Sequence, residues 1–258
     1  MADAGGGQMR RIFAGQNAFH NDVILITDHD DIAYISGVLR MKTGDSLLVS
    51  DGVSRACETR ITAISKTAIE LRVQAECLFE TGRKTEITLY QGMPKGAKMD
   101  EIVRKSTELG VRRILPIVTC RSVSSANNKS GASQEKIRRW RRIAEEAARQ
   151  SQRMEIPEVG DVISLPEAVK GLKNEDYDIV LILFELEEKL SLKEALRDRM
   201  PEFPKIAVFI GPEGGFEQEE VDLLVSHGAV TVTVGETILR TETAGPAAIA
   251  MIMYEMEL

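Results

Sequence analysis

Residues 205–224 read KIAVFIGPEGGFEQEEVDLL: an apolar run, a loop with three glycines and a proline, and an acidic segment. The apolar run is typical of a strand buried in a parallel sheet, and the acidic segment of a helix. A glycine loop between such elements puts backbone N–H groups and the positive end of the helix dipole where open α/β sheets bind ligands. The stretch therefore predicts an α/β fold with a ligand-binding loop at residues 210–217.

The glycine loop differs from the loops that grip phosphates. Its pattern is G-x-x-G-G rather than G-x-G-x-x-G, and no Lys-Ser or Lys-Thr pair ends it. Glu213 and Glu217 would repel a phosphate, so a ligand that is neutral or cationic where it meets the loop, with hydroxyl groups, fits better. A tight turn that needs glycine for its positive φ would leave the same pattern, and this alternative stays open.

The remaining chain shows two patterns. Residues 22–77 contain short alternating runs typical of β-strands, with one helical stretch, DIAYISGVLR, at residues 31–40. After residue 85, strand-like and helix-like segments alternate, which predicts a mostly parallel sheet with helices on both faces. We expect a small β-barrel followed by an α/β domain, with the boundary near residue 80.

The composition is that of a globular protein. The 258 residues are 43% hydrophobic and 28% charged, enough for one large domain or two modest ones. The first eight residues, MADAGGGQ, are expected to form a flexible tail. Apolar runs such as IVLILF at 179–184 are too short to span a bilayer, so we expect no membrane partner and a cytoplasmic location. Cys57, Cys77 and Cys120 lack metal-type spacing, which predicts reduced thiols and no metal site.

Charge is distributed unevenly along the chain. The net charge is −7, but residues 95–153 contain fifteen Lys or Arg and six Asp or Glu, a net +9 that leaves −16 elsewhere. Within this segment, residues 138–153 (RRWRRIAEEAARQSQR) combine apolar residues at helical spacing with arginines on the other faces. A helix of this kind is typical of a surface that contacts successive phosphates of a nucleic acid. A solvated basic face balanced by acidic neighbours is the alternative.

A second strand that is followed by a glycine-containing loop occurs later in the chain. Residues 232–252 read VTVGETILRTETAGPAAIAMI: a strand, a loop with Gly235, then Arg240 and Glu242 just before a helix. Thr243 is the expected cap of this helix, and Pro246 falls in its expected first turn. We expect the carboxyl ends of these two strands to lie near one another in the sheet.

Several ordered motifs together resemble one family, the bacterial ribosomal RNA small-subunit methyltransferases that modify N3 of a uridine in 16S rRNA. This family belongs to the SPOUT (α/β-knot) superfamily. The similarity spans nearly the whole chain after Met9, with one departure: an acidic residue and a glycine are expected where Arg149 and Gln152 stand. The motifs are IGPEGGF at 210–216, LRTETA at 239–244, KGAKMDEIVRKSTELGV at 95–111, RWRRIAEEAARQSQR at 139–153 and RRIF at 10–13.

The resemblance implies a fold and a cofactor. It implies a PUA-like RNA-binding β-barrel at residues 9–78 and a SPOUT methyltransferase domain at 79–258, with a deep C-terminal trefoil knot and pairing into a homodimer. It also implies S-adenosylmethionine, which carries a sulfonium cation and no phosphate. The residues implied to bind it are Leu183, Phe184, Glu185, Gly211, Pro212, Glu213, Gly214, Val234, Gly235, Ile238, Leu239 and Ala244.

The implied chemistry is attack by uracil N3 on the sulfonium methyl group. Because N3 is protonated at neutral pH, the site must remove that proton or stabilise the uracil anion. Arg240 is the expected stabilising cation, and Glu242 could orient it or act as the base. A salt-bridged surface arginine and a carboxylate placed by the helix dipole are the alternatives.

The implied partner is 16S rRNA, within the small ribosomal subunit or a late assembly particle. With 5% aromatic residues, the chain is expected to recognise a folded RNA surface rather than a naked strand. Two rivals stay open, a 2′-O-ribose methyltransferase of the same superfamily and a non-catalytic assembly factor; a nucleotide hydrolase is a distant third. The expected RNA contacts are Arg10, Arg11, Lys95, Lys98, Arg104, Arg112, Arg113, Arg138, Arg139, Arg142, Arg149 and Arg153.

Overall fold

The chain forms two compact units in the computed structural model, which describes residues 9–78, 85–122, 132–187, 189–197 and 200–257. The first unit comprises Met1–Gly82 and, from much later in the chain, Arg149–Ile156. The second comprises Arg83–Ala148 and Pro157–Leu258. The expected flexible tail, residues 1–8, lies outside the described residues.

The first unit is a mixed six-stranded half-barrel in the strand order β1-β4-β5-β6-β3-β2. Side chains alternate across the strands, so that residues such as Ile61 and Leu71 point into one apolar core. The helical stretch predicted at residues 31–40 is confirmed as α1 and η2. The elements are β1 Arg11–Phe13, η1 Gln16–Ala18, β2 Phe19–His20, β3 Val23–Ile26, α1 His29–Ala33, η2 Tyr34–Val38, β4 Ser46–Ser50, β5 Arg55–Ile64 and β6 Ile69–Leu78.

The second unit is built on a seven-stranded sheet in the order β10-β8-β7-β12-β11-β13, with β9 beside β8. All of its paired strands are parallel, so the predicted parallel sheet is confirmed. The elements are β7 Glu86–Gly92, α2 Lys98–Glu108, β8 Arg113–Val118, α3 Ala132–Gln150, β9 Glu158–Val159, β10 Ile163–Ser164, α4 Leu165–Leu172, β11 Ile179–Leu183, α5 Leu192–Arg197, β12 Lys205–Ile210, α6 Gln218–Ser226, β13 Val230–Val232 and α7 Thr241–Glu257.

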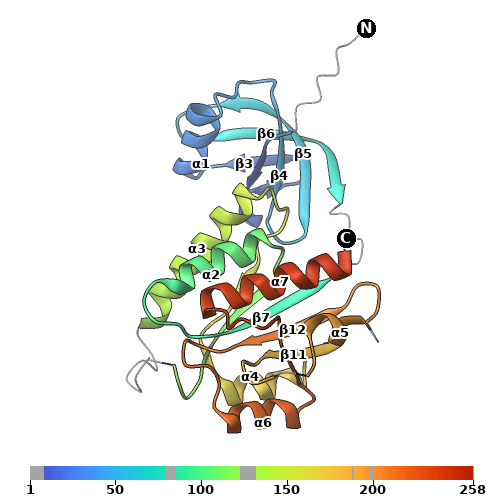
Figure 1. Ribbon diagram of the computed structural model, residues 1–258. Helices are drawn as coiled ribbons and strands as arrows, with labels where there is room; N and C mark the ends of the chain where they lie inside the picture. Colours follow the sequence, from blue (N-terminus) through green and yellow to red (C-terminus); the bar gives the residue numbers. More distant parts are fainter. Residues whose placement is uncertain (1–8, 79–84, 123–131, 188, 198–199, 258) are drawn as a thin grey trace. The chain divides into compact units, whose positions relative to one another are not determined.

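Helices cover both faces of this sheet (Figure 1). The helices α2 and α7 pack side by side over one face, and α4 and α6 pack together over the other. Strand β12 is central and carries the run KIAVFI, whose residues after Lys205 are all buried, as expected of a strand covered on both faces. Among the described residues, no helix is both long and apolar enough to cross a membrane.

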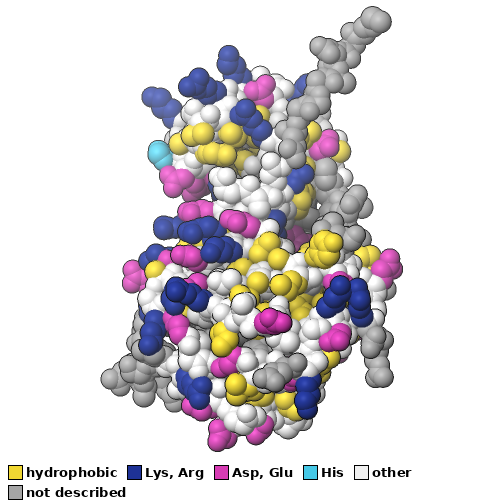
Figure 2. All heavy atoms as spheres, viewed as in Figure 1, with side chains coloured by type: hydrophobic (Ala, Val, Ile, Leu, Met, Phe, Trp, Pro, Cys, Tyr) yellow, Lys and Arg dark blue, Asp and Glu magenta, His cyan; other side chains and the backbone are white. Residues whose placement is uncertain are grey.

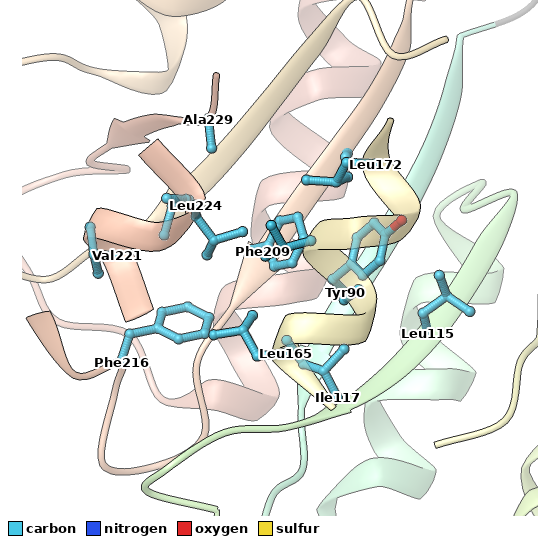
Figure 3. Close-up of a cluster of buried hydrophobic side chains, with 14 residues drawn as sticks. Tyr90, Leu115, Ile117, Leu165, Leu172, Phe209, Phe216, Val221, Leu224 and Ala229 are labelled. Carbon is cyan, nitrogen blue, oxygen red and sulfur yellow. The ribbon is translucent and has the colours of Figure 1, made fainter. Parts of the chain in front are cut away.

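The core beneath α4 and α6 is centred on two stacked rings (Figure 3). Phe209 of β12 and Tyr90 of β7 are paired in register, and their ring centroids lie 4.3 Å apart with nearly parallel planes. Leu165 of α4 and Leu224 of α6 pack into the same cluster. This packing fixes β7 and β12 against each other, and the candidate site begins where these two strands end.

Candidate active site

The parallel register lines up the carboxyl ends of four strands. Gln91 of β7 pairs with Ile210 of β12, Ile210 with Leu183 of β11, and Leu183 with Val232 of β13. The segments that follow these residues therefore leave the sheet next to one another, at the edge where open α/β sheets bind ligands. The expected cofactor residues at 183–185, 211–214 and 234–235 lie at or just after three of these strand ends.

The glycine loop after β12 is shaped by close backbone approaches. Gly215 has a φ of +68°, and its N–H donates to the carbonyl oxygen of Pro212 at 2.9 Å, which closes a tight turn. A Cβ on Gly215 would lie 2.2 Å from Oε1 of Glu185, and one on Gly92 would lie 2.6 Å from the nitrogen of Pro212. The glycines thus serve the turn and also let the exits of β7, β11 and β12 meet.

The loop carboxylates are engaged by cations of the protein itself. Arg121 donates to both carboxylate oxygens of Glu217 at 2.7 and 2.9 Å, and to the carbonyl oxygen of Gly214 at 2.7 Å. Glu213 lies 2.9 Å from Nζ of Lys98 and accepts the backbone N–H of Lys95. These contacts give both carboxylates a structural role, because they hold the loop in place.

Ionisation of both carboxylates is favoured by these contacts. Burial raises the pKa of Glu213, but the hydrogen bonds from Lys98 and from backbone N–H groups outweigh it and hold the pKa below its usual value. The Arg121 guanidinium lowers the pKa of Glu217. Both side chains therefore carry their negative charge at neutral pH and keep Lys98 and Arg121 occupied.

The last helix begins earlier than expected. The backbone oxygen of Arg240 accepts the N–H groups of Thr243 and Ala244, both at 2.8 Å, so α7 starts at Thr241 rather than after Thr243. The buried Thr241 hydroxyl donates to the carbonyl oxygen of Gly211 at 2.7 Å and accepts from Nε2 of Gln91 at 2.9 Å. These contacts tie the helix start to the ends of β7 and β12. Pro246 consequently lies inside the helix.

The two expected catalytic residues have different surroundings. Arg240 is exposed, and its guanidinium makes no ion pair or hydrogen bond with a described residue, although its positive charge contributes to lowering the pKa of Glu242. Glu242 lies 3.2 Å from Nζ of Lys98, and its side chain is only 15% exposed. Its own backbone N–H at the start of α7, and then Lys98, hold the pKa of Glu242 below its usual value. A carboxylate in this state is a weak base.

The expected RNA contacts of the second unit fall into three groups. Arg113 is held by Glu158 and Glu175, Arg139 by Asp100, and Lys98 by the two glutamates of the site. Lys95 and Arg104 are exposed, and no ion pair engages their side chains among the described residues. The partly engaged residues are Arg138, which donates to the backbone of Gln134, Arg142, 3.8 Å from Glu146, and Arg112.

The remaining expected RNA contacts lie in the first unit. Arg11, Arg149 and Arg153 line one small hollow there, and Arg10 donates to the carbonyl oxygen of Leu39 at 2.7 Å. Arg149 lies 2.8 Å from Asp31, which balances part of its charge. The structure thus brings three of the expected basic residues together on this unit, although they come from distant parts of the chain.

Gln152, where the family pattern has a glycine, adopts a backbone conformation that favours glycine. Gln152 follows the end of α3 with a φ of +57°, the left-handed conformation that favours glycine, and its carbonyl oxygen accepts from Arg11. The glycine expected at this position would relieve that strain. The chain keeps the turn and its hydrogen bond with a less suitable residue.

Comparison with known proteins identifies the family. The RNA methyltransferase domain family matches residues 81–253, more than half of the chain. The chain belongs to this family of RNA methyltransferases. The RNA methyltransferase PUA domain family matches residues 26–74, which confirms the expected PUA-like character of the first unit.

Individual relatives cover nearly the whole of this RNA methyltransferase. A ribosomal RNA small subunit methyltransferase E from Bacillus subtilis is 34% identical over 236 residues, 89% of each chain. A protein of the same name from Mycobacterium bovis is 29% identical over 230 residues, 89% of this chain and 86% of the relative. A crystal structure of this methyltransferase from Neisseria gonorrhoeae, bound to S-adenosyl methionine, has a TM-score of 0.77 and 28% identity and covers 96% of this chain and 98% of that one.

Four residues of the RNA methyltransferase site were missed by sequence reasoning. Gly215 could have been found, because it is the third glycine of the loop. Thr241 stands inside the LRTETA motif, but nothing in the pattern showed that its hydroxyl faces Gly211 and Gln91. Arg121 and Gln91 carry no local signal, because the contacts that involve them join residues 96 and 150 positions apart.

Proposed function

We propose that this RNA methyltransferase transfers the methyl group of S-adenosylmethionine to N3 of a uridine in 16S rRNA of the small ribosomal subunit. The observation that supports the proposal is the alignment of the carboxyl ends of β7, β12, β11 and β13, with glycine-containing loops after β12 and β13. Arg240, just before α7, is exposed. The similarity to ribosomal RNA small subunit methyltransferases E, one of which is bound to S-adenosyl methionine, supports it.

The loops that follow the aligned strand ends fit S-adenosylmethionine better than they fit a nucleotide. Lys98 and Arg121, the two cations that contact the glycine loop, are already bound to carboxylates and are not free to hold a phosphate. Glu185 lies against Gly215 and makes no hydrogen bond to a described residue, so its carboxylate is available to accept from hydroxyl or amino groups. Leu186 follows Glu185 in the sequence, and Ile238 precedes Arg240 by two residues. Their side chains are 71% and 82% exposed and offer apolar surface.

The proposed cofactor pocket is formed by the three strand exits and the segment that leads into α7. When bound, S-adenosylmethionine supplies an electrophilic methyl group on its sulfonium sulfur. The residues assigned to hold it are those expected from the sequence together with Gly215. They are Leu183, Phe184, Glu185, Gly211, Pro212, Glu213, Gly214, Gly215, Val234, Gly235, Ile238, Leu239 and Ala244.

Arg240 is assigned the stabilisation of the uracil anion. As N3 loses its proton, negative charge develops on the flanking carbonyl oxygens, and a preorganised cation beside one of them lowers the barrier. Its guanidinium is not consumed by another described residue, which supports this role. Glu242 is assigned to orienting charge around Arg240 rather than to proton removal, because its lowered pKa makes it a weak base.

The decisive experiment identifies the methylated nucleoside. The purified protein is incubated with small ribosomal subunits that lack the modification and with methyl-labelled S-adenosylmethionine, and the RNA is digested to nucleosides. We expect labelled 3-methyluridine. A labelled 2′-O-methyl nucleoside would identify the ribose methyltransferase of the same superfamily, and RNA binding without transfer would identify an assembly factor.

RNA binding is proposed for both units. The proposed domains are a PUA-like domain at residues 9–78 and a methyltransferase domain at residues 79–258. The first compact unit, which also includes residues 149–156, carries the basic hollow around Arg11, Arg149 and Arg153, and the second unit carries Lys95 and Arg104. These cations would contact phosphates of a folded RNA surface, and the target base would be flipped out to reach the methyl group. The substrate is proposed to be the small ribosomal subunit or a late assembly particle, in the cytoplasm.

A homodimer with a C-terminal trefoil knot is proposed for the assembly. Hydrophobic side chains gather over α7 (Figure 2), and Met251 and Tyr254 on this helix are 44% and 69% exposed. A patch of this kind on an otherwise charged surface is typical of a protein–protein contact. Light scattering coupled to gel filtration should give twice the mass of the chain; the mass of a single chain would exclude the dimer.

A further inference from the structure

Lys98 stands between two carboxylates that come from distant parts of the chain. Its Nζ lies 2.9 Å from Oε1 of Glu213 in the glycine loop and 3.2 Å from Oε2 of Glu242 in the first turn of α7. Lys98 itself is the first residue of α2. One side chain therefore joins the segments that follow β7, β12 and β13.

The surroundings of Lys98 strengthen this link. Its side chain is 35% exposed, and the carboxylates that it contacts are 25% and 15% exposed. The hydrogen bond to Glu213 raises the pKa of Lys98, so the ammonium group keeps its charge at neutral pH. The backbone N–H of Lys95 also donates to both oxygens of Glu213, at 3.0 and 3.2 Å. Both ends of the short segment 95–98 thus bind the glycine loop.

We propose that Lys98 is a positioning residue: it holds the glycine loop against the start of α7, so that the cofactor-binding backbone and Arg240 keep a fixed spacing. The inference rests on the proposed function, because it assigns Lys98 to the cofactor site. It reassigns Lys98 from the expected phosphate contact, since a phosphate would have to displace two carboxylates. The Thr241 hydroxyl supports the same junction from the buried side.

Loss of the ammonium group has a defined consequence. Glu213 and Glu242 would face each other without the cation between them, and the repulsion would push the glycine loop away from α7. The backbone N–H of Lys95 would still bind Glu213, so the loop would be displaced rather than unfolded. Cofactor binding would weaken, while the exposed cations proposed to contact RNA would be unchanged.

The test compares Lys98→Met with Lys95→Met in the full-length protein. Both variants remove one positive charge from the same segment, but the Lys95 side chain makes no ion pair with a described residue. Calorimetry with S-adenosylmethionine should show binding weakened about tenfold for Lys98→Met and by less than about twofold for Lys95→Met. RNA binding at several salt concentrations should show a salt slope reduced by about one for Lys95→Met only.

Two further results decide between positioning and phosphate contact. Glu242→Gln added to Lys98→Met should recover part of the cofactor affinity, because it removes the repulsion; a lost phosphate contact would not be recovered. If Lys98→Met does not fold, as judged by thermal melting, Glu242→Gln alone removes the contact between Lys98 and α7 and should weaken cofactor binding without changing the RNA salt slope.

The outcomes separate this inference from the proposed function. Unchanged cofactor affinity in Lys98→Met, together with a reduced RNA salt slope, would overturn the positioning role and restore the phosphate contact. Failure of the unsubstituted protein to bind S-adenosylmethionine would instead overturn the proposed function, and the positioning role with it.

Discussion

At the scale of single residues, the site is distinguished by which charges are already balanced. Glu213, Glu217 and Lys98 are held in ion pairs that shape the loop, whereas Arg240 has no such partner among the described residues. Charge pairing within the protein lowers the ability of a group to act on a ligand, because the partner must first be displaced. The free guanidinium is therefore the group most available for chemistry.

Substitution Arg240→Ala tests this assignment. Removing a cation from beside a developing anion should lower kcat by about 10²- to 10³-fold. Affinity for S-adenosylmethionine, measured by calorimetry, should stay within about threefold, because the proposed pocket is formed by other residues. The control is Lys193→Ala, an exposed cation of α5 with no ion-pair partner among the described residues, which should keep full turnover. Loss of cofactor binding in Arg240→Ala would move Arg240 into the pocket and out of the catalytic role.

Gly215 offers a second test at this scale. An alanine there would adopt a φ of +68° and would place its Cβ on the Glu185 carboxylate, so we expect a loss of about 1–2 kcal/mol in the free energy of unfolding and weaker cofactor binding. Gly44→Ala is the matched control: Gly44 also has a positive φ, but a Cβ there meets no atom within 4 Å. It should lose stability in chemical denaturation without any change in cofactor affinity. Equal cofactor affinity in both variants would argue against contact between Glu185 and the cofactor.

At the scale of elements, strands and helices were easier to predict than their ends. The buried run KIAVFI indicated β12 directly, because a strand covered on both faces is apolar throughout. The start of α7 was predicted three residues late, because Thr243 was taken as the cap while the backbone oxygen of Arg240 accepts the first helical N–H groups. Contacts of Thr241 with Gly211 and Gln91 decide that start, and they join distant segments.

The end of α3 leads to a stability prediction. Gln152→Gly should raise the free energy of unfolding by about 0.5–1 kcal/mol, because glycine adopts the positive φ without strain and the gain exceeds its extra entropy in the unfolded chain. The hydrogen bond from Arg11 uses the backbone oxygen and would persist. Gln150→Gly, inside the last turn of the same helix, should instead lower stability by about 1 kcal/mol. Denaturant titration measures both, and a destabilised Gln152→Gly protein would contradict the explanation.

At the scale of the whole molecule, the paired carboxylates of the site contribute to the dependence of stability on pH. The pKa values of Glu213, Glu217 and Glu242 are lowered in the folded protein, so the folded state binds fewer protons than the unfolded state in this range. Their contribution to stability is complete above the ordinary Glu value of 4.5 and is lost as the pH falls through the folded values. The raised pKa of Lys98 acts at the opposite end, where its contribution is lost above its ordinary value of 10.5.

Thermal melting between pH 3 and pH 9 tests this dependence. We expect a nearly constant melting temperature from about pH 6 to 9 and a steep fall below about pH 4.5. In Glu217→Gln the acid fall should be smaller, since one of the titrating carboxylates is absent. A melting temperature that rises on acidification would contradict the assignment of these ion pairs.

Local features of this protein could be predicted from its sequence: the parallel sheet from alternating apolar and helical runs, the glycine loop from its composition, and the family from several motifs in order. Tertiary structure alone decided which charges are free, how residues 149–156 join the first unit, and that Lys98 faces two glutamates rather than solvent. These features differ in how far apart along the chain the interacting residues lie. Helix and strand periodicity is set by neighbours along the chain, whereas an ion pair depends on segments that meet only when the sheet has formed.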